Sequence, residues 1–299
     1  MPEPINITFL GTGAAIPTLK RRHAEILFQY GGDYFLFDCG EGTQLQLEKA
    51  KVSPMKLSKI FITHWHADHF AGLLPMIESL HLSRRTEPLE VYGPEASRFI
   101  DAIVELSYWG VGFGIKAKDW NEEDIEKIVE NDKYEIYAIK VKHSVPTVGY
   151  CFKEKDHWHI DINKAKKYGL EGRLLKVIKE KGKIEVGKKT IRLEQIATKK
   201  EGRKIVYSGD TVPCKQLFEM ARGADILIHD GTFIELPSLE RPHSSAIEVA
   251  RLAKKYKVKK LILTHLSRRY KTNKEILDAV KPIFKNVVVA EDLMKITLK

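Results

Sequence analysis

Cysteine is scarce in this chain of 299 residues, which contains only Cys39, Cys151 and Cys214. The three residues lie far apart and form no C-x-x-C pair. They therefore predict no disulfide framework, and they favour a reducing compartment.

Long apolar runs are also missing. No stretch approaches the length of a membrane span, and the first residues, Met1-Pro2-Glu3-Pro4, do not have the pattern of a signal peptide. We therefore expect a cytoplasmic protein without a membrane partner.

Acidic residues are outnumbered, with 40 Asp and Glu against 50 Lys and Arg, for a formal net charge of +10. The excess favours a polyanionic partner such as nucleic acid, or a membrane surface, although a soluble protein that is merely lysine-rich would have the same balance. Residues 153–189 hold twelve Lys or Arg against six Asp or Glu, a surplus of six charges. We interpret this stretch as an inserted projection with one or two helices, with a charged solvated linker as the alternative.

The most informative stretch is Thr63-His64-Trp65-His66-Ala67-Asp68-His69, which places three imidazoles and one carboxylate within six residues. It follows the apolar run 60–62, which reads as a buried strand. Clustering His and Asp at a strand end is costly unless the groups bind something. Imidazole nitrogen and carboxylate oxygen together suit Zn²⁺ and similar divalent metals.

Further candidate ligands or acid–base groups also follow predicted strands. They are His143, Asp210, His229 and His265. Because layered α/β folds build their sites at strand ends, we expect one site between the two halves of an α/β chain. Asp38, at the end of another strand, is placed to support a metal-bound histidine.

The hydrophobic periodicity predicts that strands and helices alternate along the chain. Strands are expected at 5–10, 24–29, 34–37, 60–62, 90–92, 134–142, 148–152, 190–193, 204–207, 224–228, 258–263, 286–289 and 295–297. Helices are expected at 43–50, 70–82, 94–106, 215–221, 246–256 and 273–280. The strands at 24–29 and 34–37 form a hairpin around Gly31-Gly32-Asp33, and Ser244 is the expected N-cap of the helix at 246–256.

Taken together, these motifs resemble those of the metallo-β-lactamase superfamily, and within it the ribonuclease Z (tRNase Z) family. The resemblance rests on Phe9-Leu10-Gly11-Thr12-Gly13, Asp38-Cys39-Gly40-Glu41-Gly42-Thr43-Gln44, the His64–His69 motif, His143, Ser208-Gly209-Asp210-Thr211, Leu263-Thr264-His265-Leu266-Ser267-Arg268-Arg269-Tyr270 and Ala290-Glu291-Asp292-Leu293. It covers the chain from about Ile5 to the C-terminus. It implies a single αββα sandwich domain with a protruding basic arm at about 153–189.

The resemblance also implies a dinuclear centre with two Zn²⁺ ions per subunit, with Mn²⁺ or another divalent metal as an alternative. One ion would be held by His64, His66 and His143. The other would be held by Asp68, His69 and His265, with Asp210 bridging the two.

The implied reaction is hydrolysis of a phosphodiester in precursor tRNA, which releases the 3′ trailer. Asp68 would orient the attacking water and take its proton, and His243, held by Asp230, would protonate the departing 3′ oxygen. The family commonly has His-Glu-Ala-Thr where this chain has His229-Asp230-Gly231-Thr232, so the carboxylate here is one methylene shorter. Whether it reaches His243 is open at this stage.

The basic stretch has the position of the family's tRNA-binding arm, and the resemblance implies a homodimer in which one subunit's arm holds tRNA for the other's site. The Gly-Pro-rich signature of that arm is replaced here by Gly169-Leu170-Glu171-Gly172-Arg173-Leu174-Leu175. Eight cations are the candidate RNA contacts: Lys153, Lys155, Lys164, Lys166, Lys167, Arg173, Lys176 and Lys179.

Two other functions remain open from the sequence. One is a different hydrolase on the same fold, such as a small-molecule phosphodiesterase or thioesterase. The other is a metal-stabilised RNA-binding protein without catalysis, which the presence of both Asp68 and Asp210 disfavours.

Overall fold

The first sheet is built from the first 119 residues of the chain and completed by its last strand. In the computed structural model, which describes residues 3–108, 110–187, 189–235 and 242–299, the strand order is β18-β1-β2-β3-β4-β5-β6. The strands are β1 (Ile5–Gly11), β2 (Glu25–Tyr30), β3 (Asp33–Phe37), β4 (Leu57–Phe61), β5 (Leu89–Gly93), β6 (Ile115–Asp119) and β18 (Lys295–Leu298). The predicted hairpin is present, because β2 and β3 pair antiparallel around Gly31 and Gly32.

The second sheet has the order β17-β16-β15-β14-β9-β8-β7. Its strands are β7 (Ile125–Glu130), β8 (Tyr134–Lys140), β9 (Val148–Glu154), β14 (Lys204–Tyr207), β15 (Ile226–Asp230), β16 (Leu261–Thr264) and β17 (Val287–Val289). Strands β14 to β17 are parallel, and β8 and β14 both run antiparallel to β9. The carboxyl ends of β8, β14, β15 and β16 therefore lie at the same edge of the sheet.

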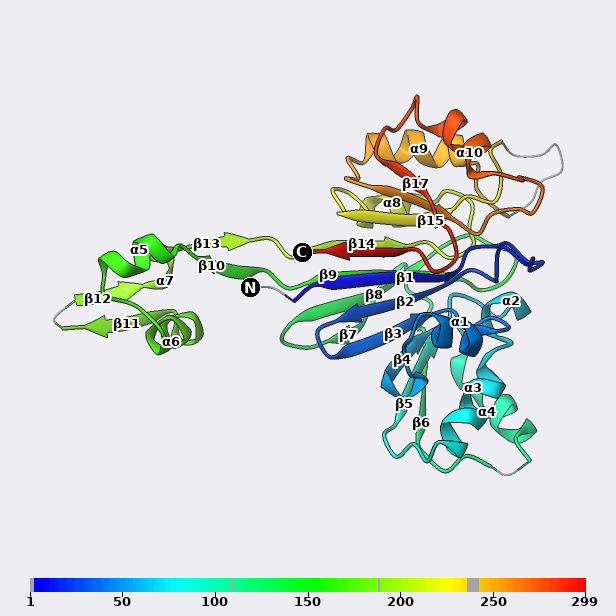
Figure 1. The fold of residues 1–299 in the computed structure, drawn as a ribbon, viewed down its shortest axis with the longest axis horizontal. Helices are drawn as coiled ribbons and strands as arrows, with labels where there is room; N and C mark the ends of the chain where they lie inside the picture. The colour runs from blue at the N-terminus through cyan, green and yellow to red at the C-terminus, as the bar shows by residue number, and fades with distance from the viewer. Residues whose placement is uncertain (1–2, 109, 188, 236–241) are drawn as a thin grey trace.

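The two sheets pack face to face around a largely aromatic core. Phe28, Phe37, Phe61, Tyr150 and Phe152 lie in this core and are each at most 4% exposed. Helices cover the outer faces, with α1 to α4 against the first sheet and α8 to α10 against the second (Figure 1). The layers form the αββα sandwich that the resemblance implies.

The helices of the sandwich mostly match the predicted ranges. They are α1 (Thr43–Lys49), α2 (Ala67–Phe70), α3 (Leu73–Leu82), α4 (Ala96–Leu106), α8 (Lys215–Met220), α9 (Ala246–Lys255) and α10 (Asn273–Val280). Across the described ranges, no helix combines the length and apolar character that a membrane crossing requires.

Two local predictions about helices were wrong. The helix expected at 70–82 is interrupted at Gly72, which packs so tightly that an added Cβ would lie 2.1 Å from the Gly40 carbonyl oxygen. The N-cap of α9 is Ser245, whose side chain accepts a hydrogen bond from the Glu248 amide. Ser244 instead donates its hydroxyl to the Thr211 carbonyl, at 2.5 Å, which ties the start of α9 to the loop after β14.

Two strands of the sandwich, β6 and β7, were not predicted because their residues are mostly charged or half-exposed. β6 reads IKAKD and β7 reads IEKIVE, and both lie at sheet edges. Edge strands with charged side chains lack the apolar alternation that identifies a half-buried strand.

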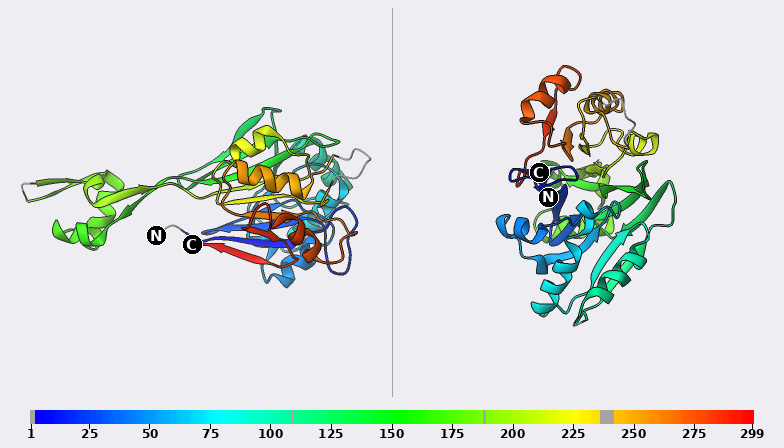
Figure 2. Two further views of the ribbon diagram at one scale, coloured as in Figure 1. Left: turned by 90° about the horizontal axis from the view of Figure 1, so that it is seen from above. Right: turned by 90° about the vertical axis from the view of Figure 1, so that its right-hand side faces the viewer.

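The chain leaves the sandwich between β9 and β14 to form a long projection, here called the arm (residues 155–202), visible in both Figure 1 and Figure 2. It contains β10 (His157–Ile160), α5 (Ile162–Lys167), α6 (Arg173–Lys181), β11 (Lys183–Val186), β12 (Lys189–Arg192), α7 (Leu193–Ile196) and β13 (Ala197–Lys200). The outgoing β10 pairs with the returning β13. The strand expected at 190–193 is thus part of the arm, paired with β11 in a small hairpin.

The junction between arm and sandwich, here called the neck, is fixed by a buried ion pair. Glu154 at the end of β9 accepts hydrogen bonds from Arg203 Nε at 2.8 Å and Nη2 at 2.7 Å, and also from the Tyr30 hydroxyl at 2.7 Å. Arg203 also donates to the Leu298 and Glu3 carbonyls, beside both chain ends. Gly202 allows the two segments to approach, since an added Cβ would lie 1.7 Å from the Glu154 carbonyl oxygen.

Candidate metal centre

Seven potential ligands converge at the carboxyl edge of the strands, from both halves of the chain. His64 and His66 follow β4, His143 follows β8, Asp210 follows β14 and His265 follows β16. Asp68 and His69 lie in the short helix α2. Their ligand atoms form two adjacent groups, His64 with His66 and His143, and Asp68 with His69, Asp210 and His265. These are the two sets that the resemblance implies.

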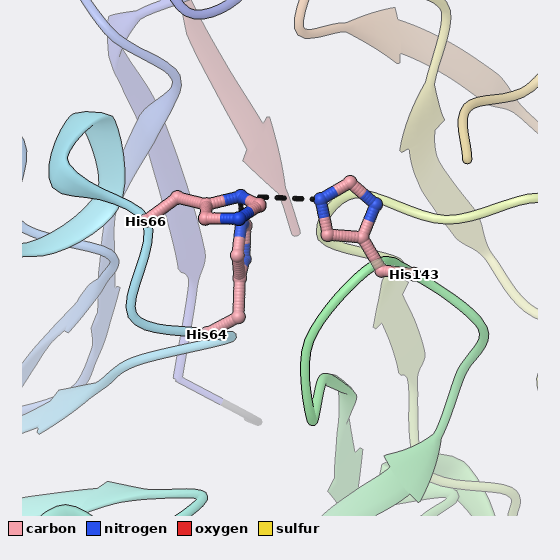
Figure 3. A group of neighbouring side chains, drawn as sticks. All are labelled: His64, His66 and His143. Carbon is pink, nitrogen blue, oxygen red and sulfur yellow. Dashed lines mark hydrogen bonds between the residues drawn. The ribbon is translucent and has the colours of Figure 1, made fainter. Parts of the chain in front are cut away.

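The first group consists of three imidazoles that face one another (Figure 3). His66 Nδ1 lies 3.0 Å from His64 Nε2 and 3.2 Å from His143 Nε2. The outer nitrogens have other partners: His143 Nδ1 lies 2.8 Å from the Pro242 carbonyl, to which it donates, and His64 Nδ1 lies 3.0 Å from the Thr63 hydroxyl. The Pro242 carbonyl places the proton of His143 on Nδ1, and because the Thr63 hydroxyl donates to Asp38, it accepts from His64 Nδ1, so the Nε2 lone pairs of both rings point inward.

The second group pairs two carboxylates with two imidazoles. Asp210 Oδ2 lies 3.0 Å from His265 Nε2 and 3.4 Å from His69 Nε2. Asp68 Oδ2 lies 3.5 Å from His69 Nε2 and 3.7 Å from His265 Nε2, and it accepts a hydrogen bond from the Ala15 amide at 3.1 Å.

Asp38 orients His69 from behind, as its position after β3 predicted. It is fully buried and has a φ of 61°, in the left-handed region. Its Oδ2 lies 2.9 Å from His69 Nδ1 and accepts a hydrogen bond from the Tyr207 hydroxyl at 2.9 Å, while Oδ1 accepts from the Thr63 amide and hydroxyl. With Nδ1 donating to Asp38, His69 presents Nε2 to the site.

The electrostatics of the group favour bound cations. Burial would raise the pKa of Asp68, but His265 and His69 outweigh it and hold that pKa well below its usual range. Burial would lower the pKa of His265, but Asp210 and then Asp68 raise it to about 10, so its Nε2 holds a positive charge between the carboxylates that a bound cation would replace. Burial and the neighbouring His69 lower the pKa of His64, so that imidazole is neutral, as a metal ligand must be.

Among the described residues, the buried Asp210 Oδ1 has no hydrogen-bond partner, and His69 Nε2 and His265 Nε2 face carboxylate oxygens at 3.0–3.7 Å without forming a hydrogen bond. Buried polar atoms in native proteins normally form hydrogen bonds, so the missing hydrogen bonds of these three atoms require an explanation. Nitrogen and carboxylate donors in two adjacent groups fit a pair of divalent ions such as Zn²⁺. The residues present therefore suit the implied metals.

His243 and Asp230 meet beside the two groups. Asp230, at the end of β15, is fully buried, and its Oδ2 lies 2.9 Å from His243 Nδ1. The shorter carboxylate therefore reaches its histidine. The His243 ring stacks on His265 with a centroid distance of 5.3 Å and lies 5.1 Å from the His143 ring.

Thr232 is a structural residue of the site that the sequence did not single out. Its hydroxyl donates to Asp230 Oδ1 at 2.6 Å and lies 2.9 Å from His265 Nδ1. It therefore links the His243 pair to the second ligand group. Its position two residues after Asp230 in the quoted motif is the signal that could have found it.

The remaining histidines lie outside the ligand groups formed by the described residues. His229 is buried against Phe218, and its Nδ1 donates to the Asp230 carbonyl at 3.0 Å, in line with a supporting role for the Asp230 loop. His23 is buried near Gly40, and His81 Nδ1 accepts a hydrogen bond from the Gly112 amide. His157 and His159 lie on β10 in the arm.

The eight candidate RNA-contacting cations lie in three places. Lys153 and Lys155 are at the neck, where Lys155 pairs with Glu130 at 2.9 Å. Exposed on α5 are Lys164, Lys166 and Lys167, and exposed on α6 are Arg173, Lys176 and Lys179. Six of the eight therefore lie on the arm's helices.

Two family models match parts of the chain. The model described as "Beta-lactamase superfamily domain" matches residues 187–266, and the model described as "Anti-Pycsar protein Apyc1" matches residues 5–99. Both matched segments contain residues of the candidate metal centre.

Relatives that align over nearly the whole chain indicate the family more specifically than these two models do. A ribonuclease Z of Methanosarcina acetivorans is 40% identical over 302 residues, covering 98% of this chain and 98% of that protein. A ribonuclease Z of Pyrococcus horikoshii is 38% identical over 300 residues, covering 99% of this chain and 96% of that protein.

Solved structures agree in fold. The short form of human tRNase Z has a TM-score of 0.71 and 29% identity, covering 98% of this chain and 99% of that one. The metallo-β-lactamase fold protein YhfI of Bacillus subtilis has a TM-score of 0.72 at 19% identity, covering 99% of this chain and 100% of that one, a likeness of fold alone.

Proposed function

The chain belongs to the ribonuclease Z family and is a metal-dependent endoribonuclease that processes the 3′ ends of tRNA, and we propose that its seven converging ligands hold two Zn²⁺ ions for this reaction. Cleavage leaves a 3′ hydroxyl on the tRNA and a 5′ phosphate on the trailer. The observation that carries the proposal is the meeting of both ligand groups with the His243–Asp230 pair at one sheet edge.

His64, His66 and His143 would hold one ion, and Asp68, His69 and His265 the other, with Asp210 shared between them. When bound, such a metal pair lowers the pKa of a water molecule and neutralises charge on the phosphoryl oxygens. Mn²⁺ or another divalent ion would suit the same donors.

Asp68 orients the attacking water and accepts its proton. Its Oδ2 faces both His69 and His265, and the Ala15 amide donates a hydrogen bond to the same oxygen. Because His265 and His69 hold Asp68 in its ionised form, its carboxylate can accept a hydrogen bond from the attacking water.

His243 delivers the proton that the departing 3′ oxygen needs. Its Nδ1–H is directed at Asp230, so Nε2 is the nitrogen that faces the substrate and carries the transferred proton. Thr232 and the Thr211 amide, which donates to Asp230 Oδ2 at 3.2 Å, hold the carboxylate in place. This assigns His243 as general acid and Asp230 as its positioning partner.

The arm supplies affinity for precursor tRNA through phosphate contacts from its exposed cations. It leaves the sandwich at the neck, where β9 ends and β14 begins, whereas the metal centre lies at the opposite end of these strands. Along the seven residues of β9 that separation is roughly 20 Å, before the arm extends further away. This supports a homodimer in which each arm serves the partner's centre.

Three free cysteines, two of them buried, fit a reducing cytoplasm as the place of the reaction. The function is tested by incubating the purified protein with a 3′-extended tRNA and mapping the cut. A single cut at the 3′ end, lost with a chelator and restored by Zn²⁺ or Mn²⁺, is the expected result. Binding without cleavage in either metal would contradict it.

A further inference from the structure

A cavity of about 550 Å³ lies next to the metal centre and has no part in the steps described so far. Its size is within the range of small-ligand pockets, roughly 300–1,000 Å³. Its walls come from three places: the turn after β6, the segment that follows β8, and the first turn of α8. The residues that matter here are Trp120, Lys140, Lys142, His143, Val145 and Gln216.

His143 belongs to both the cavity and the metal centre. One side of its ring lines the cavity, and its Nε2 lies 3.2 Å from His66 Nδ1 in the first ligand group. A molecule whose reacting phosphate lies at the metal centre would therefore have its adjoining part against the cavity.

The walls combine apolar surface with positive charge. Val145, Pro146 and the buried Trp120 provide apolar contacts, and the exposed side chains of Lys140 and Lys142 outnumber the exposed Glu122, the one acidic residue among the described residues that line the cavity. Lys140 Nζ lies 5.9 Å from the centroid of the Trp120 ring. Apolar surface edged by cations suits a flat heterocycle attached to a phosphate, as in a nucleotide.

We propose that this cavity binds the base of the last nucleotide retained in the mature tRNA, with Lys140 and Lys142 beside its phosphate. The assignment rests on the proposed function, because it uses His243 as the acid at the departing 3′ oxygen. The His243 ring lies 5.1 Å from the His143 ring and 5.3 Å from the His265 ring, and of these two neighbours His143 lines the cavity, so the ribose that carries this oxygen is within reach of the cavity. The first trailer nucleotide is attached on the other side of the scissile phosphate.

The test uses three precursor tRNAs: one intact, one abasic at the last retained nucleotide, and one abasic at the first trailer nucleotide. With the unaltered enzyme, removing the retained base should lower kcat/KM about tenfold, the scale of one lost base contact, and removing the trailer base should not. Gln216→Trp fills the cavity from α8 and should lower kcat/KM on the intact precursor by a similar factor. It should cause no further loss on the precursor that lacks the retained base.

Lys215→Trp is the matched control, because Lys215 is the exposed neighbour of Gln216 on the same helix and does not line the cavity. A second pair of variants adds no bulk. Lys142→Ala should raise KM for the intact precursor, and Lys118→Ala, at an exposed lysine on β6, should not.

Additive losses for Gln216→Trp and the missing retained base would overturn the inference, as would a loss confined to the missing trailer base. If the intact precursor is not cut at all, the proposed function itself is wrong.

Discussion

The metal end of the sandwich and the arm carry charge in opposite ways. At the metal end, Asp38, His64, His69, Asp210 and Asp230 are all at most 2% exposed, and each lies within hydrogen-bond or ion-pair distance of a neighbouring side chain. In the arm, the lysines of α5 and α6 are exposed, and a small apolar cluster that includes Leu170, Ile178 and Ile196 holds the segment together. Buried charge supports chemistry because its positions are fixed, whereas exposed charge supports binding to a long polyanion. The difference indicates that the metal centre carries out the reaction and the arm provides affinity for tRNA, so that one can be changed without the other.

The largest effect is expected from a substitution that abolishes the reaction at the metal end. Asp68→Ala should lower cleavage of precursor tRNA and of bis(p-nitrophenyl) phosphate alike, by about 10³-fold or more, because it removes both a ligand and the proton acceptor. The fold should persist, as measured by circular dichroism and thermal melting, since Asp68 is partly exposed and not in the core. Asp101→Ala, on the exposed face of α4, is the control. A fully active Asp68→Ala enzyme would contradict the proposed mechanism.

The next largest effect also concerns the metal end, and it should differ between the two substrates. His243→Ala should slow precursor cleavage by about 10²- to 10⁴-fold, the usual contribution of general acid catalysis. Bis(p-nitrophenyl) phosphate has a leaving group that does not need protonation, so it should be slowed much less. Equal slowing on both substrates would remove the general-acid role from His243.

The neck tests whether the arm must be held at a fixed angle. Arg203→Lys keeps the charge but loses the two-point contact with Glu154, so the arm should be less well positioned. KM for precursor tRNA should rise about three- to tenfold with little change in kcat. The control is Lys199→Arg on β13, which pairs with Asp156 on the surface. A fall in kcat with KM unchanged would show that the neck does not act through binding.

The smallest effect on cleavage is expected at a buried carboxyl beneath the metal end, which acts on stability and not on the reaction. Burial raises the pKa of Glu25 to about 8, and Thr43 supplies its one side-chain hydrogen bond. Because the folded state keeps its proton to higher pH than the unfolded state, stability is full below about pH 4.5 and falls as pH rises to about 8, by up to about 1.4 kcal/mol per pH unit. Glu25→Gln should therefore unfold with a weaker pH dependence in urea titrations between pH 5 and 9. An unchanged pH profile would mean that Glu25 is ionised in the folded protein.

The sequence predicted the metal end better than the arm for a physical reason. Each ligand follows an apolar strand, so periodicity and residue type together placed His64, His143, Asp210 and His265 at one edge. The contact of Asp230 with His243 depends on about an ångström of side-chain reach, which no pattern encodes, and the role of Thr232 depends on the same geometry. In the arm, the four-residue strands β10, β11 and β13 are too short for alternation to distinguish them from loops.

The division of roles between the metal centre and the arm is tested most directly by removing the arm while keeping the neck. Lys153 on β9 pairs with Lys204 on β14, so a short Gly-Ser turn in place of residues 157–200 can join the strands and retain Glu154 and Arg203. We predict that kcat/KM for precursor tRNA falls at least about a hundredfold, because the phosphate contacts are lost, and that hydrolysis of bis(p-nitrophenyl) phosphate changes less than about twofold. An equal loss on both substrates would contradict the separation of chemistry from affinity.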